Sequence, residues 1–290
     1  MATPEQWLAG ARPRTLPAAV SPVLAGTGVA AYLDGSVWWK ALLALLVAVA
    51  LQVGVNYAND YSDGIRGTDA DRVGPMRLVG SGAAPAADVK RAAFACFAIA
   101  CLAGLALAVT TSWWLVAIGA VCVAAAWFYT GGSRPYGYRG LGEVMVFVFF
   151  GLVAVVGTTY VQTGTLPLPS WYAGAGVGAL TCAILVANNL RDAPTDRDAG
   201  KRTLAVVMGE EQTRYFFAFL VAFAGIALVG VVLETSRWVL VAFAFVIPVT
   251  PAVRRVLQGA RGPALVPVLQ DVGVSVLVYA TGIFLALVTA

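Results

Sequence analysis

The chain has 290 residues, of which 60% are hydrophobic and 12% charged, and its mean hydropathy is +0.81. A soluble protein of this length would need far more than the 34 charged side chains present here (19 Lys and Arg, 15 Asp and Glu), so the composition excludes a soluble globular protein and indicates a polytopic membrane protein. The absence of histidine excludes histidine-ligated haem, histidine-based zinc sites and Ser–His catalytic triads.

Nine apolar segments are long enough to cross a bilayer, because a spanning helix needs roughly 20 residues. In chain order they are about 15–33, 37–58, 90–110, 112–130, 141–162, 171–190, 213–233, 237–257 and 267–289. Prolines interrupt the first segment and the last two, so the limits of these three are the least defined. The pattern predicts an all-α polytopic membrane protein, with nine transmembrane helices in one bundle and a single domain over residues 1–290.

Lysine and arginine concentrate on one side of this predicted topology. When helix ends are counted with their nearest loop, 17 of the 19 fall on the side of the N-terminus, and only Lys40 and Arg237 fall on the other side. Since positively charged loops stay in the cytoplasm, we expect the N-terminus inside and the C-terminus outside. The two longest inner loops, 59–89 and 191–212, follow the second and sixth spans and are expected to form a cytoplasmic cap.

Two short acidic clusters stand at the ends of the second and sixth spans. Their polar members are Asn56, Asn59, Asp60 and Asp63 in the first, and Asn188, Asn189, Asp192 and Asp196 in the second. Residues three or four apart share a helix face, and carboxylates are costly at membrane depth. Because Mg²⁺ is often held by one or two carboxylates together with substrate phosphates, two such clusters facing each other could hold Mg²⁺ against a diphosphate. The alternative interpretation is that these are solvated helix-end carboxylates or partners of nearby arginines.

Basic residues accompany the acids. Arg66 lies in the first of the two long loops, and Lys201 and Arg202 follow the second cluster in a short Gly-Lys-Arg-Thr turn. Cations placed beside a metal-bound diphosphate would stabilise the charge on the leaving group. Positive-inside topology by itself accounts for most of the other basic residues.

A third inner segment, residues 129–143, combines glycines with side chains that could reach a ligand. The candidates are Arg134, Tyr138 and Arg139. An ordinary glycine-rich connector is the alternative. Aromatic residues on either side of this segment could line an apolar tunnel and shield a carbocation, or could face lipid or pack in the bundle. They are Trp127, Phe128, Phe147, Phe149 and Phe150.

The two acidic motifs resemble those of the UbiA-type intramembrane prenyltransferases. That family has nine spans, an N-D-x-x-D motif after the second and a D-x-x-x-D motif after the sixth, which appear here as residues 59–63 and 192–196. The resemblance covers essentially the whole chain, and the pair of motifs is specific where either alone would be weak. Most members carry a further Asp where this chain has Gly67, and the resemblance leaves open whether Asp69 replaces it.

The resemblance implies an activity and its partners. The motifs look like the branch that prenylates 1,4-dihydroxy-2-naphthoate on the way to menaquinone, and so do the segments Arg12-Pro13-Arg14-Thr15, Gly74-Pro75-Met76-Arg77-Leu78 and Asn189-Leu190-Arg191-Asp192. The resemblance implies Mg²⁺-dependent transfer of a polyprenyl group from a polyprenyl diphosphate to the naphthoate, with release of diphosphate and carbon dioxide. Later oxidation of the dihydroxy product would give demethylmenaquinone. The expected partners are these two substrates and the lipid bilayer, without nucleic acid. The expected location is a bacterial inner or plasma membrane, with a cytoplasmic active site.

By position, the resemblance also implies roles for single residues. The implied metal ligands are Asn59, Asp60, Asp63, Asp192 and Asp196, and the four carboxylates form the implied catalytic set together with Lys201. The implied substrate-contacting residues are Asn56, Asn59, Arg66, Arg134, Tyr138, Arg139, Asn188, Asn189 and Arg202.

Other functions fit parts of the pattern. A prenyltransferase acting on another aromatic acceptor, 4-hydroxybenzoate or haem, would use the same motifs. An ion-coupled transporter would also bury Asp and Asn near helix breaks, but it would place ionisable groups near the bilayer midplane, whereas the acids here stand at inner span ends. A non-catalytic membrane scaffold would need no paired acids.

Overall fold

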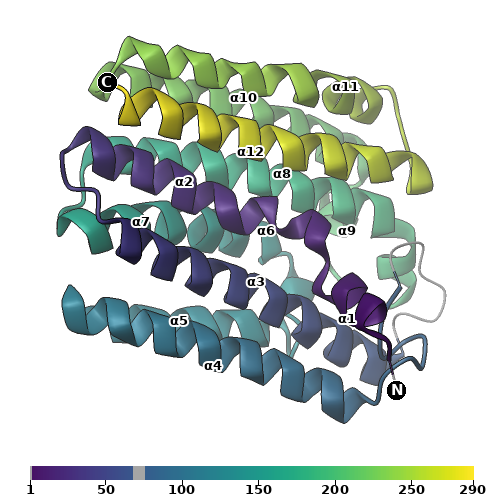
Figure 1. The fold of residues 1–290 in the computed structure, drawn as a ribbon. Coiled ribbons are helices and arrows are strands. Elements are labelled where there is room, and N and C mark those ends of the chain that lie inside the picture. Colours follow the sequence, from purple (N-terminus) through teal and green to yellow (C-terminus); the bar gives the residue numbers. More distant parts are fainter. Residues whose placement is uncertain (1, 68–75) are drawn as a thin grey trace.

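The computed structural model describes residues 2–67 and 76–290, and all regular secondary structure in these residues is helical. The helices lie side by side along one common direction, with the N and C ends at opposite ends of the bundle (Figure 1). In chain order the elements are α1 (Pro4–Ala11), η1 (Pro13–Thr15), α2 (Pro17–Tyr32), α3 (Trp38–Arg66), α4 (Ala86–Thr110), α5 (Trp114–Phe128), η2 (Tyr136–Arg139), α6 (Gly142–Val146), η3 (Phe147–Val153), α7 (Ala154–Thr163), α8 (Leu168–Asp198), α9 (Leu204–Met208), α10 (Glu210–Glu234), η4 (Arg237–Phe245), α11 (Val246–Leu257), η5 (Gly262–Leu265) and α12 (Val266–Val288).

Seven helical stretches in the described residues are long and apolar enough to cross a membrane. They are α3, α4, α6 to α7, α8, α10, η4 to α11 and η5 to α12. An eighth arises if Pro4–Thr15 and Pro17–Tyr32, which meet at 49°, form one broken span. The protein is therefore a polytopic membrane protein. The predicted span 112–130 coincides with α5, whose 15 residues give about 22 Å of helix against a hydrocarbon core of about 30 Å, so a ninth crossing stays a prediction.

The helices that carry the acidic clusters extend beyond the predicted spans. The apolar pattern predicts ends near residues 58 and 190, but α3 continues to Arg66 and α8 to Asp198. Hydropathy marks where the apolar stretch stops, whereas a helix stops where the backbone is capped, and α3 ends at Gly67 in a left-handed conformation with φ 71°. Both acidic clusters therefore lie on helical turns, and Pro194 lies inside α8.

The central helix of the bundle is α8. In its apolar stretch 72% of the residues are buried inside the protein, against 33% in α3, α4 and α10, and in Figure 1 it runs between α12 and the α6–α7 segment. Glycines on both sides allow α8 to pack closely against η3. A Cβ on Gly151 of η3 would lie 2.6 Å from both the carbonyl oxygen of Gly174 and the Cα of Gly178 on α8. This packing carries the second acidic cluster into the middle of the bundle.

The predicted cap over the inner face is only partly within the described residues. Of the first predicted loop, 59–89, the two ends belong to α3 and α4, and residues 76–85 are described between them. In this part Leu78 is fully buried beside Gly10 and Tyr57. In the second, residues 199–203 link α8 to the short helix α9. A cap formed by the two loops together stays a prediction.

Candidate active site

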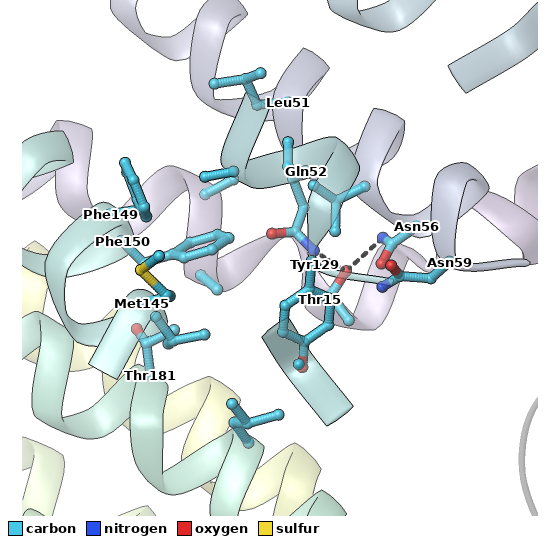
Figure 2. A pocket seen from close by; sticks show the side chains of 18 of the residues that line it. Thr15, Leu51, Gln52, Asn56, Asn59, Tyr129, Met145, Phe149, Phe150 and Thr181 are labelled. Atoms are coloured by element: carbon cyan, nitrogen blue, oxygen red, sulfur yellow. Dashed lines mark hydrogen bonds between the residues drawn. The ribbon is translucent and has the colours of Figure 1, made fainter. Parts of the chain in front are cut away.

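A cavity of about 1500 Å³ lies among α2, α3, α5, η3 and α8. One part of its wall is polar and includes members of both acidic clusters, and the rest is apolar, with Val47, Leu115, Phe149 and Val153 among its residues. Figure 2 shows Gln52, Asn56 and Asn59 together on one wall and Phe149 and Phe150 on another. A cavity with these two characters can hold a charged head group and a hydrocarbon chain at the same time.

The two acidic clusters meet at Lys201. Its Nζ lies 3.9 Å from Asp63 Oδ1 on α3 and 3.7 Å from Asp196 Oδ1 on α8. The backbone N–H of Lys201 donates to the carbonyl oxygen of Asp196 at 2.8 Å, which fixes the turn that follows α8. One acid from each cluster therefore approaches the same ammonium group, and all three side chains line the cavity.

Tyr138 of η2 contacts both Asp63 and Lys201. Its hydroxyl donates a hydrogen bond to Asp63 Oδ1, and its ring lies under Lys201, with 4.6 Å between Nζ and the ring centroid. Burial, and then the adjacent Asp63 carboxylate, raise the pKa of Tyr138 above its ordinary value of 10.0, so its hydroxyl stays a donor at neutral pH. The guanidinium of Arg77 adds a further cation, 3.7 Å from Asp63 Oδ2.

The acids and amides of α8 have partners of their own. Arg191 donates to both oxygens of Asp192, each at 2.7 Å, and also to Asn188 Oδ1 at 2.9 Å. Asn189 Nδ2 donates to Glu143 Oε1 at 2.8 Å. Asn188, Asn189 and Asp192 all line the cavity, and the charge of Asp192 is matched by its sequence neighbour.

On α3, two amide side chains are fixed at the cavity wall. Asn59 Oδ1 accepts from the Thr130 hydroxyl at 2.7 Å, and Asn56 Nδ2 donates to the Ala11 carbonyl and to Thr15 Oγ1. The structure thus places nine of the predicted site residues around one cavity. They are Asn56, Asn59, Asp63, Tyr138, Asn188, Asn189, Asp192, Asp196 and Lys201.

Five predicted site residues lie outside the cavity lining. Asp60 is 1% exposed, and its two oxygens accept the backbone N–H groups of Leu78 and Val79 at 2.8 and 3.0 Å. Arg66 donates to the carbonyls of Thr130 and Gly132 and so ties the end of α3 to the segment after α5. The other three, Arg134, Arg139 and Arg202, are exposed at the surface. Asp69, whose role was left open, lies outside the described residues.

Several residues that line the cavity were not among the predicted site residues. They include Arg12, Arg14, Thr15, Gln52, Arg77 and Tyr129. A signal for Gln52 was present in the sequence, since it is a polar side chain in an apolar span, four residues before Asn56 and on the same helix face. The sequence places Arg77 among the basic residues of the first long loop, but its approach to Asp63 depends on the path of that loop after α3.

The donor set at this site fits a hard divalent cation that arrives with a diphosphate. Asn59, Asp63, Asp192 and Asp196 present only oxygen acceptors and amide groups at the cavity, which is the chemistry that Mg²⁺ prefers. Among the described residues, no three acid or cysteine side chains are close enough to hold a metal by themselves. Mg²⁺ commonly completes its coordination with substrate phosphates and water, so this arrangement agrees with a metal bound together with its substrate.

Comparison with known proteins gives a consistent result. The sequence model of the UbiA prenyltransferase family matches residues 19–264. Two curated relatives are named 1,4-dihydroxy-2-naphthoate octaprenyltransferase: that of Mycobacterium tuberculosis is 54% identical over 98% of this chain and 97% of its own length, and that of Mycobacterium leprae is 52% identical over 100% and 98%. Among solved structures, a UbiA homologue from Archaeoglobus fulgidus bound to GPP and Mg²⁺ matches with a TM-score of 0.67 at 16% identity, covering 98% of this chain and 99% of its own.

Proposed function

Because this chain belongs to the UbiA prenyltransferase family, we propose that it transfers a polyprenyl group from a polyprenyl diphosphate to 1,4-dihydroxy-2-naphthoate, releasing diphosphate and carbon dioxide. The names of the two mycobacterial relatives support this acceptor over 4-hydroxybenzoate or haem. Membership of the family decides against the transporter and the scaffold. The observation that carries the proposal is the convergence of Asp63 and Asp196 on Lys201 at the polar part of a largely apolar cavity.

The residues around Lys201 are suited to binding and ionising the donor. Lys201 and Arg77 would attract the diphosphate and stabilise the negative charge that grows on it as the C–O bond breaks. Asn59, Asp63, Asp192 and Asp196 are the residues that would hold Mg²⁺. When bound, the ion supplies Lewis-acid stabilisation of the leaving diphosphate. Tyr138 holds Asp63 in place through its hydroxyl and shields Lys201 with its ring.

The apolar wall is suited to the other half of the reaction. Ionisation leaves an allylic cation on the prenyl chain, and the ring faces of Phe149, Phe150 and Tyr129 at the cavity can stabilise it while keeping water away. The electron-rich naphthoate ring forms the new C–C bond at its carboxyl-bearing carbon. Loss of carbon dioxide then returns an electron pair to the ring, so the transfer needs no protein group to remove a proton, in agreement with a chain that has no histidine.

We further propose that this site faces the cytoplasm of a bacterial plasma membrane. The bias of 17 of 19 basic residues to the side of the acidic clusters supports this orientation. The naphthoate anion would then enter from water and the polyprenyl diphosphate from the lipid.

The test is prenyl transfer by the purified full chain with Mg²⁺, a polyprenyl diphosphate and a panel of aromatic acceptors, scored by product mass. We expect product from 1,4-dihydroxy-2-naphthoate and none after chelation of the metal. Asp63→Asn and Asp196→Asn should each lower the rate by about 10²-fold or more, because each removes a charge at the diphosphate site. Asp88→Asn is the matched control, since Asp88 forms only an exposed ion pair with Arg91. Wild-type rates in both site variants would refute the assignment.

A further inference from the structure

Gln52 is a buried amide that the reaction scheme above does not use. It lies on α3, one turn before Asn56, its side chain lines the cavity, and the residue is 6% exposed. Figure 2 shows it on the same wall as Asn56 and Asn59, joined to Thr15 by a hydrogen bond. Its neighbours along the wall, including Leu51 and Val55, are apolar.

A chain of hydrogen bonds fixes which way this amide points. The Thr15 hydroxyl donates its single proton to the Arg12 carbonyl at 2.9 Å, so its lone pairs are left to accept. Gln52 Nε2 donates to this oxygen at 3.0 Å. A flipped amide would set its own carbonyl oxygen against an oxygen that has no proton left to give, so Gln52 must present Nε2 to Thr15 and turn Oε1 elsewhere.

That oxygen has no hydrogen-bond partner in the part of the chain that the structure describes. Oε1 of Gln52 is buried and accepts no hydrogen bond in residues 2–67 and 76–290. Buried polar atoms are almost always paired, and leaving one unpaired costs free energy that a bound donor would recover. An oxygen held in this state at a substrate cavity is therefore prepared for a hydrogen-bond donor that comes from outside the chain.

We infer that Gln52 Oε1 accepts a hydrogen bond from one hydroxyl group of the aromatic acceptor, which makes Gln52 a specificity-determining residue for a dihydroxylated ring. This inference rests on the proposed function. Of the proposed substrates, only the acceptor carries a donor, since a polyprenyl chain has no polar hydrogen and an ionised diphosphate only accepts. The spacing also fits, because Gln52 and Asp63 are separated by 11 residues, or about 16 Å of helix, which leaves room for a ring between them.

Equilibrium binding to the purified full chain tests the inference, with inorganic diphosphate and Mg²⁺ present to occupy the donor site. The probes are 1,4-dihydroxy-2-naphthoate and the two analogues that keep only the hydroxyl at position 1 or at position 4. In the wild type, the analogue that lacks the recognised hydroxyl should bind on the order of tenfold more weakly than the diol. Equal affinity for all three probes would overturn the inference without any variant.

Gln52→Leu removes the accepting oxygen at similar volume. It should weaken binding of the diol on the order of tenfold and leave the affinity for one of the two single-hydroxyl analogues within about twofold. An equal loss of affinity for all three probes would mean that Gln52 has a structural role. An unchanged affinity for the diol would mean that water occupies the position. Either result overturns the inference. Thr15→Val, which frees the amide to rotate, should cause a smaller loss of the same selectivity.

The proposed function fails separately from this inference. If the wild type gives no prenylated product from 1,4-dihydroxy-2-naphthoate, the acceptor assignment is lost. If it gives product but Gln52→Leu shows no dependence on the hydroxyl groups, only the role of Gln52 is lost.

Discussion

At the scale of single residues, the helical face of α3 explains which side chains reach the cavity. Gln52, Asn56, Asn59 and Asp63 follow one another at intervals of four, three and four residues, which keeps them in a sector of about 60° at 100° per residue. Asp60 lies about 40° outside this sector and turns to the N–H groups of Leu78 and Val79. Neighbours in one motif thus acquire different environments.

We therefore expect Asp60→Asn to lower the free energy of unfolding and to have a smaller effect on Mg²⁺ binding. An amide at this position can accept from one backbone N–H but points its NH₂ group at the other, a loss of about 1–3 kcal/mol. Thermal unfolding in detergent is the measurement, with Asp88→Asn as a surface control whose change should stay within about 0.5 kcal/mol. An unchanged melting temperature together with lost stabilisation by Mg²⁺ would instead make Asp60 a metal ligand, as its motif position implies.

Tyr138 gives a prediction about alkaline stability. Burial and the Asp63 carboxylate raise its pKa above 10.0, so the folded protein keeps the phenol proton at a pH where the unfolded chain releases it. The contribution is fully present below about pH 10 and is lost as the pH rises from there toward the higher folded pKa. Melting temperatures at pH 8 to 11 should fall less steeply in Tyr138→Phe than in the wild type. Parallel curves would contradict this interpretation of Tyr138, because Tyr136, whose pKa burial also raises, remains in both proteins.

At the scale of helices, the contact between η3 and α8 shapes the cavity. The seven residues of η3 form a π-helical insertion between α6 and α7, and both Phe149 and Phe150 from it line the cavity. Such insertions are common at functional sites, because the extra residue in the turn changes the direction of the side chains. Gly151 on the same element lies against Gly174 and Gly178 of α8, so the aromatic wall and the acidic helix are positioned by one close crossing.

Gly151→Ala should disturb this crossing. A Cβ there would lie 2.6 Å from backbone atoms of α8, which cannot move aside as a flexible side chain would, and the expected loss is about 1–3 kcal/mol. Gly157→Ala in the same membrane span is the matched control, since its Cβ would meet no atom within 4 Å. The control should be neutral or more stable by roughly 0.5–1 kcal/mol in thermal unfolding. A Gly151 variant as stable as the Gly157 variant would show that the crossing is not tight.

At the scale of the whole molecule, the two ends of the chain lie at opposite ends of the bundle (Figure 1). This placement requires an odd number of crossings, which supports the nine-span topology over eight, with α5 as the short span. The segment that carries Arg134 and Arg139 then lies at the inner end with the acidic clusters, and the turn after α7 lies at the outer end. The charge bias predicts which of these two ends faces the cytoplasm.

Cysteine labelling tests this orientation. In a chain with its four cysteines replaced, Ser133→Cys and Thr165→Cys each add one exposed thiol, before η2 and after α7. A membrane-impermeant thiol reagent should label the Thr165 variant in intact cells and the Ser133 variant only in inverted vesicles. Labelling of both variants from the same side would be incompatible with the topology.

The membrane class, most of the apolar spans and the two acidic motifs could be predicted from the sequence, because hydropathy and residue spacing act locally and are visible along the chain. The two motifs were predicted to face each other, and in the structure Asp63 and Asp196, which are 133 positions apart, both approach Lys201. Tyr138 was predicted as well, from the aromatic and basic character of its segment.

Which residues of each motif reach the cavity depends on packing between segments that are far apart in the chain. Asp60 does not line the cavity, because its carboxylate accepts hydrogen bonds from the backbone N–H groups of Leu78 and Val79 in the loop after α3. The spacing of residues within the motif does not predict this contact. Arg134, Arg139 and Arg202 are exposed at the surface, and the backbone N–H of Arg202 donates to the Tyr138 carbonyl, which joins the turn after α8 to η2. The orientation of the Gln52 amide likewise depends on Thr15 and Arg12, from a part of the chain about 40 residues away. Residue type and spacing show which hydrogen bonds and ion pairs a side chain can form. Its actual partners come from distant parts of the chain, so they depend on how the helices and loops pack.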